Sequence, residues 1–534
     1  MIKKVEKKVE KRYFDQLPNI NQFIKEYQFV WWIVGSFLLL AYGIKVFNVS
    51  ISHDTEAMMV ASRQLYNSWY SMGRFGLIFL KKVLGTYWFN PYVASFLMFA
   101  TMMVNSVVWT YLLYWIGGEK KKWMKLLWIF PTFFFTSTIM AEQSGFLLQS
   151  YEVNIALLMV GIAILCLFQA FLGTSKRKWS WIAIALICSV IAFSVYQSLV
   201  PLFTAGVAIC FLVLYDRMTV EMQEQMTAKF YFKTVGKFIT FFLIAFVLYQ
   251  VVNKAVLNFL GMETTSYIKD QIMWGTLPAK QCIKNILLHV RDSFLGKGIF
   301  YNSINGIVVS LTLGYSIFRM KRKEHCYILY CLAVIYCLIS PFLMSLLMGN
   351  APTARTQLLL PFVIGFFLQY LLVKVKEQEK KQFQYIYPVA VILVIFVTMN
   401  QSILTSRLYY TQYVQYKEDV RVAEKISDQI ELLNLGEIPK EPIVFVGARA
   451  ARKNPSCIPG NQLELIGKSF FEVSFGTEHG TWVMRNFMAT LGYSYALPDG
   501  VQIAEAEQVA AEMPAWPTTG SVAMKNGIII VKLS

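Results

Sequence analysis

The chain has 534 residues, of which 56% are hydrophobic and only 15% are charged. This hydrophobic share exceeds that of a soluble globular protein and indicates a polytopic membrane protein, with the lipid bilayer as a partner. The net charge of +18 would fit a nucleic-acid-binding protein, but the lysines and arginines stand in short clusters between apolar segments. Such clusters are typical of cytoplasmic loops, so we expect no nucleic acid.

About eleven apolar segments can be assigned as spans of a bilayer core of about 30 Å. The cytoplasmic segment before them, residues 1–27, is basic, and so is every second loop, which places the N-terminus inside and the C-terminus outside. We therefore expect a multi-pass protein of the plasma membrane. The expected spans are 28–47, 91–116, 126–140, 153–172, 181–195, 199–215, 238–260, 304–318, 327–347, 358–373 and 385–401.

The composition changes after residue 402. Residues 403–534 mix charged and apolar residues, and Asn526-Gly527 between two apolar runs is a strong signal for a two-residue hairpin turn. These patterns predict a small extracytoplasmic α/β domain behind a transmembrane domain of residues 28–402. Trp482 and Trp516 of this domain are candidates for stacking on sugar, although packing in its core is the other fate open to them.

The first outer loop, residues 48–90, carries the acids Asp54 and Glu56 at the start of an amphipathic helical stretch. A carboxylate there can act as a general base toward an acceptor hydroxyl, and Asp54 is the candidate. Aspartate is equally a favoured helix N-cap, so cap and catalyst are both open for Asp54. Glu56 is the second candidate acid, and the alternative for it is a first-turn residue that favours the helix dipole.

Two arginines on the outer face are candidates for binding a phosphate. Arg74 follows Gly73 at the membrane surface, and Arg355 precedes the tenth span. A guanidinium can hold a phosphate with two hydrogen bonds, although an interfacial arginine can also simply reach for water. For the neighbouring lysines Lys81 and Lys82 we expect this snorkelling arrangement.

Polar residues at the outer ends of the spans are candidates for binding sugar or acceptor. Glu142 and Gln149 lie between the third and fourth spans, and Tyr196 and Gln197 form a very short outer turn. Amides and carboxylates hydrogen-bond hydroxyl groups, and aromatic rings stack on sugars. The alternatives are a hydrated loop for the first pair and an interfacial aromatic belt for Tyr196.

Several sequence signals are missing. There is no Walker loop, GxGxxG or HExxH motif, and no Cys-x-x-Cys pair, so we expect no nucleotide cofactor and no zinc site. The candidate residues do not require a metal, and an ion bound by carboxylates is left open as an alternative. Cys282 and Cys457 both fall in outer segments, and a disulfide between them is an option that their spacing does not support.

Taken together, these features resemble the Gtr type II family of serotype-conversion glucosyltransferases, over nearly the whole chain. The acid of the first outer loop departs from the pattern, because His53-Asp54 stands where relatives tend to have paired aspartates. The motifs that carry the resemblance are Trp69, Gly73-Arg74, Phe130-Pro131, Tyr196-Gln197-Ser198, Arg355 and the C-terminal MPAWPTTGSVAMKNGIIIVKLS.

The resemblance implies a GT-C-like fold and a polyprenyl-phosphate-linked sugar donor, usually glucose. It also implies a cell-surface polysaccharide as the acceptor, with a donor-synthesising glycosyltransferase and a flippase as partners. Our leading hypothesis is an inverting glycosyltransferase in which Asp54 deprotonates the acceptor while Arg74 and Arg355 stabilise the leaving phosphate. The alternatives are a non-enzymatic flippase or exporter of lipid-linked sugar, and a membrane anchor for the outer domain.

Overall fold

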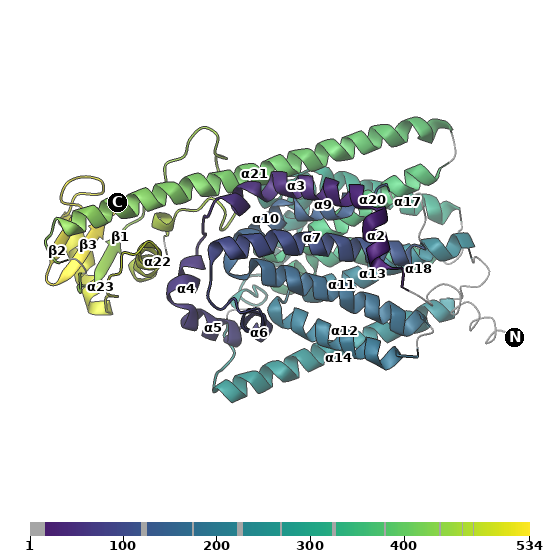
Figure 1. The fold of residues 1–534 in the computed structure, drawn as a ribbon, viewed down its shortest axis with the longest axis horizontal. Helices are drawn as coiled ribbons and strands as arrows, with labels where there is room; N and C mark the ends of the chain where they lie inside the picture. The colour runs from purple at the N-terminus through teal and green to yellow at the C-terminus, as the bar shows by residue number, and fades with distance from the viewer. Residues whose placement is uncertain are drawn as a thin grey trace.

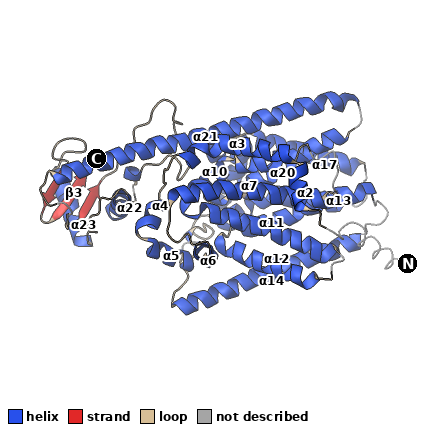
Figure 2. Cartoon of the chain, in the orientation of Figure 1, coloured by secondary structure: helices blue, strands red, loops and turns tan. Residues whose placement is uncertain are grey.

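The computed structural model describes residues 17–118, 125–173, 176–221, 228–266, 270–322, 327–378, 381–436, 439–461, 463–473 and 475–534. The basic residues of the N-terminal segment up to residue 16, and the predicted cytoplasmic turn at 120–122, lie outside these ranges. The described chain forms a long bundle of helices, with a small sheet at the end where the C-terminus lies (Figures 1 and 2).

The bundle is built from elements that range from single 3-10 turns to a helix of 51 residues. In chain order they are α2 (Ile20–Glu26), α3 (Gln28–Phe47), α4 (Thr55–Val60), α5 (Ser62–Ser71), α6 (Phe75–Val83), α7 (Pro91–Ile116), α9 (Ile129–Phe135), α10 (Thr138–Gly145), η1 (Leu147–Gln149), α11 (Ser150–Leu172), α12 (Lys178–Val195), α13 (Leu199–Glu221), α14 (Ala228–Leu260), α16 (Ala279–Leu295), η2 (Gly298–Phe300), α17 (Ile304–Lys321), α18 (Tyr327–Ile339), η3 (Ser340–Phe342), α19 (Leu343–Met348), η4 (Ala354–Thr356), α20 (Leu359–Glu377) and α21 (Lys381–Glu431).

Within the described ranges, nine helices are long and apolar enough to cross a membrane, so the expected count of about eleven spans is not confirmed. The expected span 126–140 is divided between α9 and α10. Ser137 separates them, because its backbone is extended and its hydroxyl accepts a hydrogen bond from the Met140 amide at 3.2 Å. The expected span 304–318 forms α17, which carries polar side chains such as Asn305 and Thr312 and is not one of the nine.

The C-terminal part is the small α/β domain that the sequence predicts. Its strand order is β1-β3-β2, with β1 parallel and β2 antiparallel to β3. Asn526 and Gly527 both have positive φ, 49° and 79°, as a two-residue hairpin turn requires. The elements of this domain are β1 (Ile443–Val446), η5 (Phe470–Glu472), α22 (Thr477–Thr490), α23 (Gly500–Glu512), β2 (Val522–Lys525) and β3 (Ile528–Lys532).

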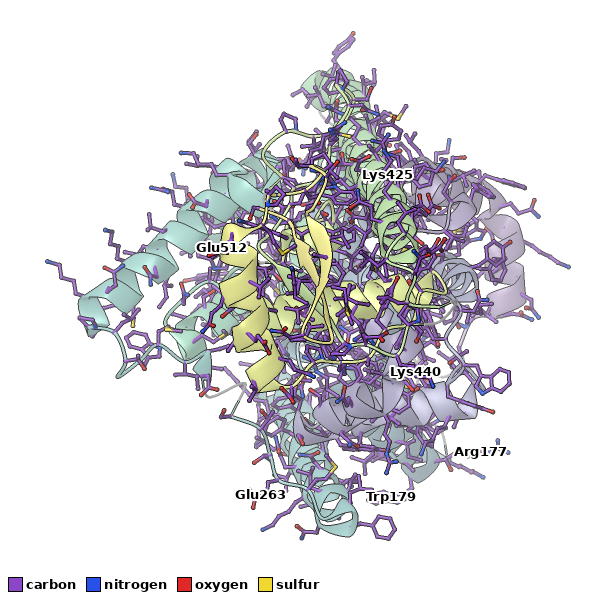
Figure 3. All side chains as sticks on the ribbon, turned by 90° about the vertical axis from the view of Figure 1, so that its left-hand side faces the viewer. Arg177, Trp179, Glu263, Lys425, Lys440 and Glu512 are labelled. Carbon is purple, nitrogen blue, oxygen red and sulfur yellow. The ribbon has the colours of Figure 1, made fainter. Side chains whose placement is uncertain are left out.

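Helix α21 joins the two parts without interruption. At 1.5 Å per residue its 51 residues extend over about 77 Å, and Figure 1 shows it running along the bundle to the sheet. The predicted boundary at residue 402 therefore falls inside one helix. Figure 3 looks at the domain end, where Lys425 of α21 and Glu512 of α23 flank the strands.

The core of the C-terminal domain includes a residue from the first outer loop. Ile51 is 3% exposed and belongs to the same apolar cluster as Phe470, Phe487 and Trp516. Trp516 is thus a core residue rather than a sugar platform. The disulfide considered for Cys282 and Cys457 is not formed, since both are free thiols with separate neighbours: Cys282 Sγ lies 3.5 Å from the Met273 carbonyl, and Cys457 near Asn454.

Candidate active site at the end of the bundle next to the C-terminal domain

Asp54 stands at the junction between the first outer loop and α4. Its backbone is left-handed, with φ 68° and ψ −16°, a region that few residues other than glycine adopt. The side chain is half-buried and makes no capping hydrogen bond to α4. The N-cap alternative is therefore wrong for the side chain, although Asp54 occupies the N-cap position. Aspartate is one of the few non-glycine residues that adopt this conformation readily, so the side chain is held here at low cost and is not used as a cap.

Glu56 lies in the first turn of α4 and is fully buried. No described side chain donates a hydrogen bond to either of its carboxylate oxygens. Burial raises the pKa of Glu56 well above its usual value, and the nearby charge of Asp54 raises this pKa further. Two neighbouring carboxyl groups with different environments are a common arrangement for proton transfer.

Three of the predicted site residues come together around the turn between α12 and α13. The Arg74 Nε donates to Gln197 Oε1 at 3.3 Å, and its guanidinium carbon lies 5.2 Å from the centre of the Tyr196 ring. Gln197 in turn donates to the Met72 carbonyl at 2.8 Å. These contacts orient the guanidinium on a rigid support, as a phosphate-binding arginine requires.

Gly73 allows this close packing. Its φ is +77°, and a Cβ at this position would lie 2.9 Å from the hydroxyl oxygen of Tyr249. That hydroxyl donates to the Gly73 carbonyl at 3.2 Å. Glycine is therefore required here both for its backbone conformation and for the space it leaves.

Arg355 and Glu142 form a second group. Arg355 pairs with Glu464 at 3.4 Å and lies over the Phe146 ring at 4.8 Å. Glu142 is fully buried and accepts hydrogen bonds from the backbone amides of Leu465 at 2.7 Å and Ile466 at 3.3 Å. Its carboxylate thus helps to attach the C-terminal domain to the bundle.

The loop before Asp54 connects to this second group. The Ser52 hydroxyl donates to the Gly145 carbonyl at 2.9 Å, and Gly145 precedes Phe146, on which Arg355 lies. The structure gives no direct contact between Arg74 and Arg355, so the two phosphate-binding candidates lie in different groups. Both groups flank the first outer loop at the same end of the bundle.

Gln149 is the strongest ligand-binding candidate among the polar residues predicted at this end. It is fully buried at the end of η1, which packs against α4, and neither atom of its amide has a hydrogen-bond partner among the described residues. Gln143 is buried with the same property. Buried amides are nearly always satisfied in folded proteins, so these two are suited to hydroxyl groups supplied by a ligand or by water.

One feature of the site contradicts the sequence interpretation. Lys81 does not snorkel: it is fully buried and forms an ion pair of 2.5 Å with Glu152, which is equally buried. The rings of Trp69, Phe89 and Tyr151 surround the ammonium at 5.4–5.9 Å. Lys82 is exposed, as expected. The sequence feature that could have indicated this ion pair is Glu152 in the first turn of the apolar helix α11, because a buried glutamate needs a cation nearby.

No group of three or more histidine, cysteine, aspartate or glutamate side chains that could hold a metal ion occurs in the described ranges. The candidate site is therefore composed of acids, amides, aromatic rings and arginines. Such a set can bind hydroxyl groups and a phosphate and can transfer a proton.

Comparison with known proteins identifies a family. The family model described as Glucosyl transferase GtrII matches residues 43–373, which include the first outer loop, both arginines and all the polar candidates. No match was found among curated proteins or among solved structures. The resemblance inferred from the sequence motifs is thus confirmed at the level of the family.

Proposed function

The chain belongs to the GtrII glucosyltransferase family, and from this premise we propose that it transfers glucose from a polyprenyl-phosphate donor to a cell-surface glycan. Transfer takes place on the outer face of the plasma membrane, with the N-terminus cytoplasmic and the C-terminal domain outside. A glycosyltransferase in a membrane bundle is what the family and the apolar helices support. The donor, the acceptor and the roles of individual residues are the proposal.

In the proposed reaction, the acceptor hydroxyl oxygen attacks the anomeric carbon of glucose. The bond between that carbon and the phosphate oxygen breaks, and polyprenyl phosphate leaves. Asp54 takes the proton of the hydroxyl, and Arg74 stabilises the charge that develops on the phosphate. A single displacement inverts the anomeric configuration. Arg355 is the second candidate for the phosphate once its exposed partner Glu464 gives way.

The observation that carries this proposal is the conformation of Asp54. At the N-cap position of α4, Asp54 makes no capping hydrogen bond, so its side chain has no evident role in stabilising this helix. Beside it, Glu56 is buried and its carboxyl has a raised pKa. Two neighbouring carboxyl groups in different environments, one half-buried and one fully buried, support a role for Asp54 in accepting the proton of the acceptor hydroxyl.

The C-terminal domain is proposed to receive the acceptor. Phe475 precedes α22, and His479 and Trp482 lie on this helix; Phe475 and His479 are exposed. The ring centroids of Phe475 and His479 are 5.8 Å apart, and those of His479 and Trp482 are 6.1 Å apart. Helix α22 packs against α4, which begins at Asp54. Exposed rings of this kind suit stacking on sugars, so this group could present a glycan chain to the base.

The test is transfer by the purified full-length protein in lipid nanodiscs. Synthetic polyprenyl-phosphate glucose and an isolated cell-surface polysaccharide are supplied, and glucose on the polysaccharide is measured. The proposal predicts transfer with inversion. Movement of a labelled lipid-linked sugar across a vesicle membrane without any transfer would instead favour the flippase alternative.

A further inference from the structure

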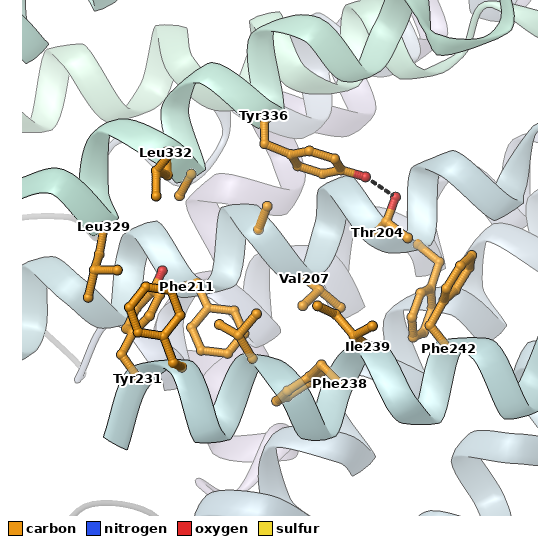
Figure 4. A pocket seen from close by; sticks show the side chains of 15 residues that line it. Thr204, Val207, Phe211, Tyr231, Phe238, Ile239, Phe242, Leu329, Leu332 and Tyr336 are labelled. Carbon is orange, nitrogen blue, oxygen red and sulfur yellow. Dashed lines mark hydrogen bonds between the residues drawn. The ribbon is translucent and has the colours of Figure 1, made fainter. Parts of the chain in front are cut away.

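Two cavities lie one after the other between the helices α13, α14 and α18. The outer cavity has a volume of about 600 Å³ and the inner one about 330 Å³. Both are lined by Thr204, Phe242 and Tyr336, so they meet at these side chains. At this point the Tyr336 hydroxyl donates to the Thr204 hydroxyl oxygen at 2.5 Å, as Figure 4 shows, and ties α18 to α13.

The two cavities together form one groove along the membrane-spanning part of α14. Residues of α14 line this groove from Tyr231 at its inner end to Asn253 at its outer end. At 1.5 Å per residue that distance is about 33 Å, close to the thickness of a bilayer core of about 30 Å. All three helices are among the candidate spans, so the open side of the groove faces lipid.

The inner part of the groove is almost entirely apolar. Phe211, Phe238 and Ile239 form its walls, as seen in Figure 4. Water is not stable in such a space, and a hydrocarbon chain is its natural occupant.

The outer end of the same groove is polar. Gly73, Gln197 and Asn253 line it. Asn253 is 8% exposed, and its carbonyl oxygen Oδ1 has no hydrogen-bond partner among the described residues. Gln197 accepts a hydrogen bond from Arg74 at 3.3 Å, so the cation of the candidate site lies directly behind the lining of the groove. A molecule that fits has one long apolar chain and an anionic, hydrogen-bonding head.

We propose that this groove binds the isoprenoid chain of the lipid-phosphate sugar donor, with its phosphate beside Arg74 and Gln197. The inference rests on the proposed function for the identity of the head group. Two adjoining cavities in a single row accommodate one chain, whereas a bilayer phospholipid carries two, and the charge of Arg74 complements the phosphate. Binding along the groove would fix the anomeric carbon at the outer end, where the first outer loop lies.

The first experiment measures binding alone, so that it does not depend on sugar transfer. A long isoprenoid phosphate without sugar, carrying a diazirine near the chain end, is photo-crosslinked to the full-length protein in nanodiscs, and labelled peptides are mapped. Labels are expected on α13, α14 or α18, with competition by unlabelled isoprenoid phosphate and little by phosphatidylglycerol. Labels on other helices, or equal competition by the diacyl lipid, would overturn the proposal.

The second experiment narrows the inner cavity. Ala208→Trp and Ala333→Trp fill it from α13 and α18, and Ile187→Trp on the exposed face of α12 is the matched control. The variants should raise KM for a long-chain donor by roughly tenfold or more, as expected for displaced apolar chain. KM for a donor with two isoprene units should stay unchanged, as should both KM values of the control. Equal effects on both donors would contradict a chain-binding groove, and if the variants do not fold the crosslinking on the unaltered protein decides.

Discussion

The imidazole of His53 stacks on the ring of Phe470, with ring centroids 4.9 Å apart and planes within 5°. The His53 Nε2 also lies 2.8 Å from the Ser469 carbonyl. His53 is the residue before Asp54, and Phe470 belongs to the C-terminal domain. The C-terminal domain therefore touches the candidate base through its immediate neighbour, and the position of the acid depends on how that domain is docked.

This contact predicts that the C-terminal domain controls the rate of transfer. Replacing Phe470 by alanine removes the ring stacked on His53 and on Phe487, and should cost about 3–5 kcal/mol of stability, as for other buried phenylalanines. Hydrogen exchange should rise in residues 50–56, and kcat should fall while the membrane helices stay protected. Phe471→Ala in the same core, without the contact to His53, is the control. Unchanged exchange in the loop would contradict the coupling.

The raised pKa of Glu56 predicts a pH dependence of stability. The folded protein holds this proton more tightly than the unfolded chain, whose carboxyl titrates near 4.5. The contribution of this proton to the free energy of unfolding is therefore fully present below that pH. It is lost as the pH rises toward the pKa of the folded protein, by up to about 1.36 kcal/mol per pH unit. Thermal unfolding in detergent at several pH values measures this slope. Glu56→Gln should flatten this slope. An unaltered slope would contradict the assignment of the pH dependence to the Glu56 carboxyl.

Arg74 should be sensitive even to lysine. A lysine keeps the charge but cannot reproduce the planar arrangement over Tyr196 and the hydrogen bond to Gln197. We expect Arg74→Lys to lower kcat by about 10²–10³-fold, the usual effect of losing one stabilising donor. Arg355→Lys, whose present partner is the exposed Glu464, should have a smaller effect. The opposite order in steady-state kinetics would transfer the leading phosphate role to Arg355.

The buried Lys81–Glu152 pair should matter for stability when it is broken on one side. Lys81→Met leaves Glu152 without its cation and should destabilise the protein by about 3–5 kcal/mol, seen as a lower Tm. Glu152→Gln leaves the ammonium among three aromatic rings and should destabilise it too. The double variant should recover a part of the loss. Additive losses would show that the two charges do not act as a pair.

Much of the bundle could be predicted from hydropathy, because a bilayer demands long apolar helices. The bounds predicted for the first two spans, 28–47 and 91–116, coincide with α3 and α7. The break in the third span could not be predicted from hydropathy, since it depends on the local conformation of Ser137 within an apolar run. The hairpin at Asn526-Gly527 was predictable because few residues tolerate two consecutive positive φ angles.

The site was predictable only in part. Arg74, Tyr196 and Gln197 meet as the predicted topology implies, because it places all three at span ends on the same side of the bilayer. The attachment of Glu142 to residues 465 and 466 joins positions more than 300 residues apart, and no local pattern indicates it. The N-cap preference of aspartate predicted Asp54 as a helix cap. This preference does not distinguish an extended backbone from a left-handed one, and the backbone conformation decides whether the side chain can reach the helix amides.

The most direct test of the account is the transfer rate of Asp54→Asn. Asparagine tolerates the left-handed backbone that Asp54 adopts, and Asp54 makes no capping bond to lose, so the variant should fold and bind donor normally. Asp54→Gly also suits this conformation and is a second variant that lacks the carboxyl group, so a loss of activity shared by both variants does not come from an altered backbone. Without a basic carboxylate, transfer of glucose by both purified variants should fall by roughly 10²–10⁴-fold. Transfer by Asp54→Asn at a near-normal rate would contradict Asp54 as the catalytic base.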